Sequence, residues 1–141
     1  MRIATWLLGL TLLAGAEPVV ATEVLADEAY RLQQQGTLLI DIRQPEEWRE
    51  TGIAQGALRI PMAHPQGAAG FLNAVLEAVG GDRDASIALI CRSGNRSRRM
   101  QQLLQQHGFS DVVSVADGMT GGAAGPGWVG RGLPVEHCAD C

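Results

Sequence analysis

The fold of this chain is decided by one stretch, SIALICRSGNRS at residues 86–97. It begins with the apolar run 86–90, whose length is typical of a buried strand. Cys91 follows directly, then the four residues Arg92, Ser93, Gly94 and Asn95, then Arg96 at the start of a predicted helix. We expect the loop amides and the helix N-terminus to form an anion-binding cradle around the Cys91 sulfur. Because the thiolate is the reactive form of cysteine, such a cradle favours a nucleophilic role for Cys91.

The segments on both sides of this stretch alternate between strand and helix patterns. Strands are expected at 37–42, 57–61 and 111–115, and helices at 27–35, 45–50, 71–79 and 96–107. Such alternation favours an α/β domain with a parallel sheet. In open sheets of this kind the ligand site lies outside the carboxyl ends of the strands, which is where Cys91 stands.

Length and charge narrow the class of protein. The chain has 141 residues, which is enough for one domain with a real core. All eleven basic residues are arginines, although the formal net charge is −4. Four of these arginines crowd into the eight positions after Cys91, namely Arg92, Arg96, Arg98 and Arg99. Positive charge focused at one loop suits a small anionic ligand, whereas DNA needs a broad basic face and RNA favours aromatic platforms.

The N-terminal 21 residues have the pattern of a cleaved signal peptide. Met1-Arg2 supplies positive charge, residues 3–16 form an uncharged apolar stretch, and small residues before Thr22 fit a cleavage site after Ala21. Residues 14–16 offer a second cleavage site. A retained membrane anchor is the alternative, but the apolar stretch is shorter than the ~20 residues of a spanning helix. We therefore expect an exported protein, periplasmic or otherwise, without a membrane association after cleavage.

Three segments resemble the rhodanese family of sulfurtransferases, in its single-domain exported bacterial form. They are LLIDIRQPEEW at 38–48 with its continuation to 61, the loop from Cys91 to Arg96, and the region 118–136. The resemblance implies a three-layer rhodanese-like α/β domain over residues 22–137, with a mostly parallel central sheet flanked by helices and a tail at 138–141. Two departures are visible: Ile53 stands where many members carry histidine, and Met119 stands where a second glycine is common, with a glycine-rich stretch replacing a short helix before Trp128.

The resemblance also implies the chemistry. Cys91 attacks the outer sulfur of thiosulfate or a similar donor, sulfite leaves, and the resulting persulfide passes sulfur to cyanide, a thiol or a partner protein. The expected substrate-binding residues are those of the loop: Arg92, Ser93, Gly94, Asn95 and Arg96. Either Asp41 or Glu47 is expected to pair with Arg96 and hold the loop. No cofactor and no metal are expected, because the three histidines lack ligand spacing.

Two other functions remain open. One is a persulfide carrier that serves a partner protein, with thiosulfate turnover incidental. The other is a cysteine-dependent phosphatase or arsenate reductase. Four residues separate Cys91 from Arg96, one fewer than in such phosphatases, and the tighter ring of amides leaves less room for a phosphate ester. The loop length thus favours sulfur transfer.

Several features are predicted to be structural. Arg43 is expected to hold the fold, and Trp48 and Trp128 are expected in the core. The segment 118–127 contains five glycines and reads either as a plain connector or as a mobile loop over the site.

Cys138 and Cys141 form a C-x-x-C pair at the end of the sequence. In an oxidising compartment we expect them to form a disulfide, which leaves Cys91 as the free thiol. The alternatives are a tail that accepts sulfur from Cys91 and a disordered tail with incidental cysteines. A thiol oxidoreductase site is disfavoured because the pair does not open a helix after a strand.

Overall fold

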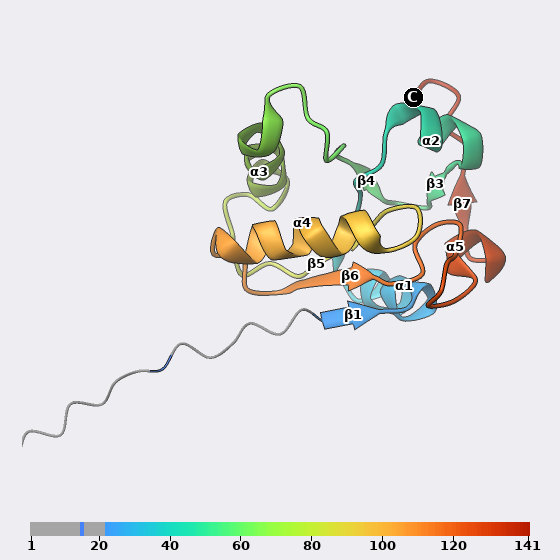
Figure 1. Ribbon diagram of the computed structural model, residues 1–141, viewed down its shortest axis with the longest axis horizontal. Helices are drawn as coiled ribbons and strands as arrows, with labels where there is room; N and C mark the ends of the chain where they lie inside the picture. The colour runs from blue at the N-terminus through green and yellow to red at the C-terminus, as the bar shows by residue number, and fades with distance from the viewer. Residues whose placement is uncertain (1–14, 16–21) are drawn as a thin grey trace, which may run out of the picture.

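A computed structural model describes residue 15 and residues 22–141 (Figure 1). The expected signal peptide lies almost entirely outside these residues, so it stays a prediction. In the described part of the chain, no helix has the length and apolar character needed to cross a membrane.

The central sheet has five strands, and each neighbouring pair is parallel. Their spatial order is β1-β6-β5-β2-β4, with bounds β1 Thr22–Val24, β2 Leu38–Asp41, β4 Leu58–Arg59, β5 Ile87–Ile90 and β6 Val112–Val115. A second, two-stranded antiparallel sheet joins β3, Ile53–Ala54, to β7, Val135–Glu136. The helices are α1 Ala26–Gln34, α2 Pro45–Thr51, α3 Gly67–Ala78, α4 Asn95–Gln106 and α5 Gly127–Gly130.

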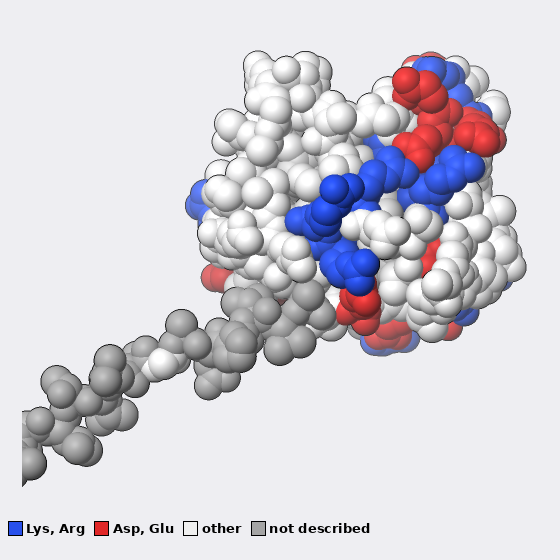
Figure 2. Space-filling model, in the orientation of Figure 1, with Lys and Arg blue, Asp and Glu red and all other residues white. Residues whose placement is uncertain are grey.

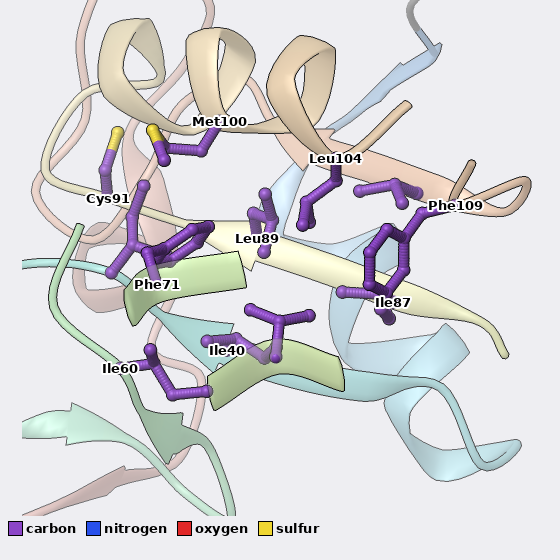
Figure 3. Packing of buried hydrophobic residues seen from close by; sticks show 12 residues of the cluster. Ile40, Ile60, Phe71, Ile87, Leu89, Cys91, Met100, Leu104 and Phe109 are labelled. Atoms are coloured by element: carbon purple, nitrogen blue, oxygen red, sulfur yellow. The ribbon is translucent and has the colours of Figure 1, made fainter. Parts of the chain in front are cut away.

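Helices cover both faces of the central sheet and create two hydrophobic cores. On one face, α3 and α4 bury Phe71, Met100 and Leu104 against Leu89, as Figure 3 shows. On the opposite face, α1 and α5 pack against side chains that alternate with the first set, such as Leu39. This period-two alternation follows from strand geometry. The predicted three-layer α/β fold with a parallel central sheet is confirmed.

Strand β5 occupies the centre of the sheet, between β2 and β6. All four of its residues are buried, as expected of a parallel strand that is covered on both faces. Residues 38–41 of β2 lie in register with residues 87–90, so the carboxyl ends of the two strands coincide. Cys91 therefore follows the strand at the middle of the sheet and opens the loop that leads into α4; both elements are labelled in Figure 1.

The sequence predicted the ends of these elements to within two residues, with one exception. Helix α3 begins at Gly67 rather than at Phe71, because Gly67 and Gly70 are poor helix formers that conceal its first turn. Strands β1, β3 and β7 were not predicted, since two or three residues carry no periodic signal. The glycine-rich stretch does end in a short helix, α5, which contains Trp128.

Candidate active site

Cys91 lies at the carboxyl end of β5 and is 1% exposed. Its Sγ atom accepts hydrogen bonds from the backbone N–H groups of Gly94, at 3.2 Å, and Ser97, at 3.4 Å. In Figure 3 the Cys91 side chain points toward the first turn of α4. N–H groups in a first helical turn have no acceptor within the helix, so they are available to negative charge. The predicted cradle around the Cys91 sulfur is present in this geometry.

Gly94 is required by the turn that forms the cradle. It precedes α4 with a φ of +99°, in the left-handed region. A Cβ atom at this position would lie 2.1 Å from the carbonyl oxygen of Ala116. Both the backbone conformation and the close approach of a neighbouring loop therefore exclude a side chain here.

The glycine-rich segment braces the cradle from the other side. The N–H of Met119 donates to the carbonyl of Cys91 at 2.9 Å, and that of Thr120 donates to the carbonyl of Arg92 at 3.0 Å. At Gly118, whose φ is +59°, a Cβ would lie 2.4 Å from the Arg92 carbonyl oxygen. Residues 118–127 are therefore more than a plain connector, because the amides of Met119 and Thr120 hydrogen-bond to the loop that contains Cys91.

Two buried serines, Ser97 and Ser114, lie behind Cys91 and were not predicted from the sequence. The hydroxyl of Ser114 in β6 donates to that of Ser97 at 2.8 Å, and the Ser97 Oγ lies 3.4 Å from the Cys91 Sγ. Ser97 also donates to the carbonyl of Gly94 at 3.1 Å. The sequence did contain a signal for Ser97, because it lies at helical spacing from Met100 and Leu104 and so shares the buried face of α4. A hydroxyl group on a buried face needs a polar partner.

Arg96 forms a bidentate ion pair with Glu47. The two Nη–Oε distances are 2.8 and 2.6 Å. Glu47 also accepts from the N–H of Gln44 and so completes a capping box at the start of α2. The hydrogen bond from Arg96 lowers the pKa of Glu47 from 4.5 to about 2, and the same bond raises the pKa of Arg96. The pair ties α2 to the loop.

Asp41 does not pair with Arg96, so that alternative is corrected. Its carboxylate binds Arg43, with Nε–Oδ1 at 3.0 Å and Nη2–Oδ2 at 2.8 Å, and both side chains are fully buried. The Arg43 guanidinium donates hydrogen bonds to both carboxylate oxygens of Asp41, and it also donates to the hydroxyl of Thr51 and the carbonyl of Gly52. Arg43 is thus structural, as expected, and it joins the end of β2 to the end of α2.

Three further loop residues, Arg92, Ser93 and Asn95, are exposed beside the cradle. Arg92 lies 3.5 Å from Glu50 and 3.9 Å from Glu47 and is half exposed. Ser93, Gly94 and Asn95 line a surface cavity of about 290 Å³. Figure 2 shows a continuous band of basic side chains across this face of the molecule. The loop therefore gives this part of the surface, next to the buried sulfur, a positive potential.

The other predicted residues lie apart from this cradle in packed positions. Trp128 is fully buried and donates through its Nε1 to the carbonyl of Pro134, and Trp48 is 5% exposed. Ile53, which stands where many rhodaneses carry histidine, packs with Trp48 and Cys138. Across the described residues, no cluster of three or more histidine, cysteine and carboxylate side chains could hold a metal ion.

Cys138 and Cys141 form the predicted disulfide, with their Cα atoms 5.5 Å apart. Among the described residues Cys91 is the free cysteine.

The chain is similar to known proteins over most of its length. The family described as "Rhodanese-like domain" matches residues 25–124. A relative from Allochromatium vinosum named sulfurtransferase is 31% identical over 98 residues, which cover 70% of this chain and 77% of the relative. Thiosulfate sulfurtransferase GlpE of Haemophilus influenzae is 27% identical over 117 residues, covering 81% and 93%. The crystal structure of Rv0390 from M. tuberculosis has the same fold, with a TM-score of 0.67 at 24% identity, covering 84% and 98%.

Proposed function

Because the chain belongs to the rhodanese-like domain family, we propose that it is a sulfurtransferase that moves sulfane sulfur from thiosulfate or a similar donor through Cys91. One observation carries the proposal: the Cys91 sulfur accepts hydrogen bonds from two backbone N–H groups at the start of α4. Relatives named sulfurtransferase and thiosulfate sulfurtransferase support the same reaction class.

The reaction has two half-reactions. The Cys91 thiolate attacks the outer sulfur of thiosulfate, the sulfur–sulfur bond of the donor breaks, and sulfite leaves with the bonding electron pair. Cys91 then carries a persulfide, and a second nucleophile attacks its outer sulfur and returns Cys91 to the thiolate. The acceptor is cyanide in an assay, and a thiol or a partner protein in the cell. Such covalent catalysis gives ping-pong kinetics.

The residues of the cradle have separate roles in this proposal. The amides of Gly94 and Ser97 stabilise negative charge on the sulfur. Arg92, on the exposed rim, attracts the anionic donor. Arg96 is held by Glu47, so its guanidinium keeps the loop in place and adds positive potential. No metal or organic cofactor takes part in these steps.

Mass spectrometry after exposure to thiosulfate tests the proposal. We expect one added sulfur atom on Cys91, and none in a Cys91→Ser variant that keeps the native circular dichroism spectrum. A Cys138→Ser/Cys141→Ser variant is the control and should load as much sulfur as the parent. Equal loading of Cys91→Ser, or robust hydrolysis of phenyl phosphate by the parent, would show that the proposal is wrong.

We also propose that the protein acts after export, on the strength of the N-terminal sequence. Cell fractionation followed by N-terminal sequencing of the mature protein tests this location. A mature chain that begins at Thr22 is the expected result, and a full-length cytoplasmic protein contradicts it.

A further inference from the structure

The C-terminal disulfide has a cation placed against both of its sulfur atoms. Nη1 of Arg59, which lies in β4, is 3.0 Å from the Sγ of Cys138 and 2.8 Å from that of Cys141. The guanidinium of Arg59 also lies over the ring of Trp48, 5.9 Å from its centroid. Trp48 thus supports the guanidinium that contacts the two sulfurs.

The two cysteines differ in accessibility. Cys138 is 8% exposed and packs with Trp48 and Ile53, whereas Cys141 is half-buried and packs at the edge of the same cluster. A cavity of about 300 Å³ opens beside Cys138, and its charged or titratable lining residues are Arg59, Glu136, His137 and Asp140. From α2, Arg49 reaches the carbonyl of Cys141 at 2.6 Å. Solvent molecules can therefore approach the pair.

This disulfide is expected to add little to the stability of the fold. Two residues separate Cys138 from Cys141, so closing so short a loop removes little chain entropy from the unfolded state. An arginine beside sulfur has its largest effect on the thiolate, which it stabilises as an anion. The contacts of Arg59 therefore stabilise the reduced pair more than the neutral disulfide.

We propose that Cys138–Cys141 is a second reactive site, an exchangeable disulfide that a dithiol reductant, small or protein-borne, opens. One thiolate of the reductant attacks the more exposed Cys141 sulfur, and the Cys138–Cys141 bond breaks. Cys138 leaves with the bonding electrons as a thiolate paired with Arg59. The second thiolate of the reductant then attacks the reductant's own sulfur in the mixed disulfide and Cys141 leaves as a thiolate, so the protein gains two electrons and the reductant becomes a disulfide. This site is independent of sulfur loading at Cys91.

A redox titration of the Cys91→Ser protein tests the proposal, because only the pair can then titrate. The protein is equilibrated in glutathione buffers of increasing reducing strength, and free thiols are trapped by alkylation and counted by mass. We expect the pair to open reversibly within the range of these buffers while circular dichroism stays native. Structural disulfides resist the glutathione pool, so a pair that stays closed across the series overturns the proposal.

A second measurement isolates Arg59. Arg59→Gln removes the cation at the sulfurs, and we expect the equilibrium constant for reduction to fall about tenfold, which is about 30 mV for a two-electron couple. Alkylation of the reduced pair at neutral pH should slow by a similar factor. Arg49→Gln is the matched control, since Arg49 contacts a carbonyl and not a sulfur. Equal titrations of Arg59→Gln, Arg49→Gln and the parent would refute the role of Arg59.

Discussion

At the scale of single residues, the ion pair between Glu47 and Arg96 connects stability to the proposed chemistry. Arg96 stands one position before Ser97, whose amide contacts the Cys91 sulfur. Glu47 holds Arg96 by two short contacts, and its side chain is 17% exposed. Charge-assisted bidentate contacts of this kind are stronger than exposed ion pairs. We therefore expect the first turn of α4 to depend on a carboxylate from α2.

The pKa of Glu47 predicts a pH dependence of stability. Between about pH 2 and pH 4.5 the unfolded chain binds a proton at Glu47 that the folded protein does not bind. The contribution of Glu47 to the free energy of unfolding therefore rises with pH across this window and stays constant above it. Glu47→Gln should remove about 1–2 kcal/mol at about pH 6 and roughly half of that at about pH 3. Urea unfolding at both values measures this. Glu50→Gln is the control, and an equal loss in both variants would contradict the assignment.

Arg96→Ala should weaken the use of anionic sulfur donors by ~1–3 kcal/mol in kcat/KM. Part of this loss arises because the Glu47 carboxylate is left unpaired near the anion. The double variant Arg96→Ala/Glu47→Gln should therefore recover some activity, which steady-state kinetics with thiosulfate would show. Arg98→Ala should cost less, and its small effect should vanish in high salt. Equal losses for Arg96→Ala and Arg98→Ala would mean that Arg96 has no special role.

The sequence predicted the loop residues better than it predicted their partners. Cys91 and Arg96 follow an apolar strand at fixed spacing, which is a local signal. The choice between Asp41 and Glu47 depended on how far each carboxylate lies from Arg96 in space, which local patterns do not encode. Ser114 reaches the site through the pairing of β6 with β5. Long-range contacts of this kind become visible only in the folded structure.

At the scale of elements, the cradle consists of the end of β5, the start of α4 and the segment that follows β6. Helix α4 was predicted because its apolar residues recur at helical spacing. The segment after β6 has no such period, so its hydrogen bonds to Cys91 and Arg92 could not be predicted. The loop that carries Cys91 is thus held at both ends by different elements.

Gly94→Ala should disrupt this junction. The change imposes a strained φ and also a Cβ at 2.1 Å from the Ala116 oxygen. Gly36→Ala is the matched control, because Gly36 has a similar φ of +103° with no neighbour within 4 Å. We expect Gly36→Ala to lose about 1 kcal/mol and Gly94→Ala to lose at least 2 kcal/mol, measured by urea unfolding. Only Gly94→Ala should lose sulfur loading. Equal stabilities of the two variants would show that the loop absorbs the extra methyl group.

At the scale of the whole molecule, one buried carboxylate joins the two ends of the domain. Asp117 is fully buried and accepts from the N–H of Ala26 at 2.9 Å, from that of Gly127 at 3.1 Å and from Nε of Arg131 at 2.9 Å. These partners belong to α1, to α5 and to the turn after α5. An aspartate in a glycine-rich region gives no sign of this role in the sequence.

Asp117→Asn should lower the free energy of unfolding by about 2–4 kcal/mol, because an amide cannot accept all three bonds and Arg131 loses its buried carboxylate partner. Asp27→Asn is the control, since Asp27 is 62% exposed and lies 3.6 Å from Arg131. We expect that variant to change stability by less than about 0.5 kcal/mol. Thermal and urea unfolding measure both, and a loss below about 1 kcal/mol for Asp117→Asn would contradict the proposed role.

The bracing of the loop by Met119 and Thr120 has a consequence for biosynthesis. A chain made from its N-terminus presents Cys91 well before the residues whose amides close its loop. The central strand β5 also cannot pair with β6 until β6 has been synthesised. Parallel pairings between strands that are distant in the sequence form slowly. A growing or unfolded chain therefore carries only an ordinary cysteine. We therefore expect the hydrogen-bonded surroundings of the Cys91 sulfur to form only when almost the whole domain has folded.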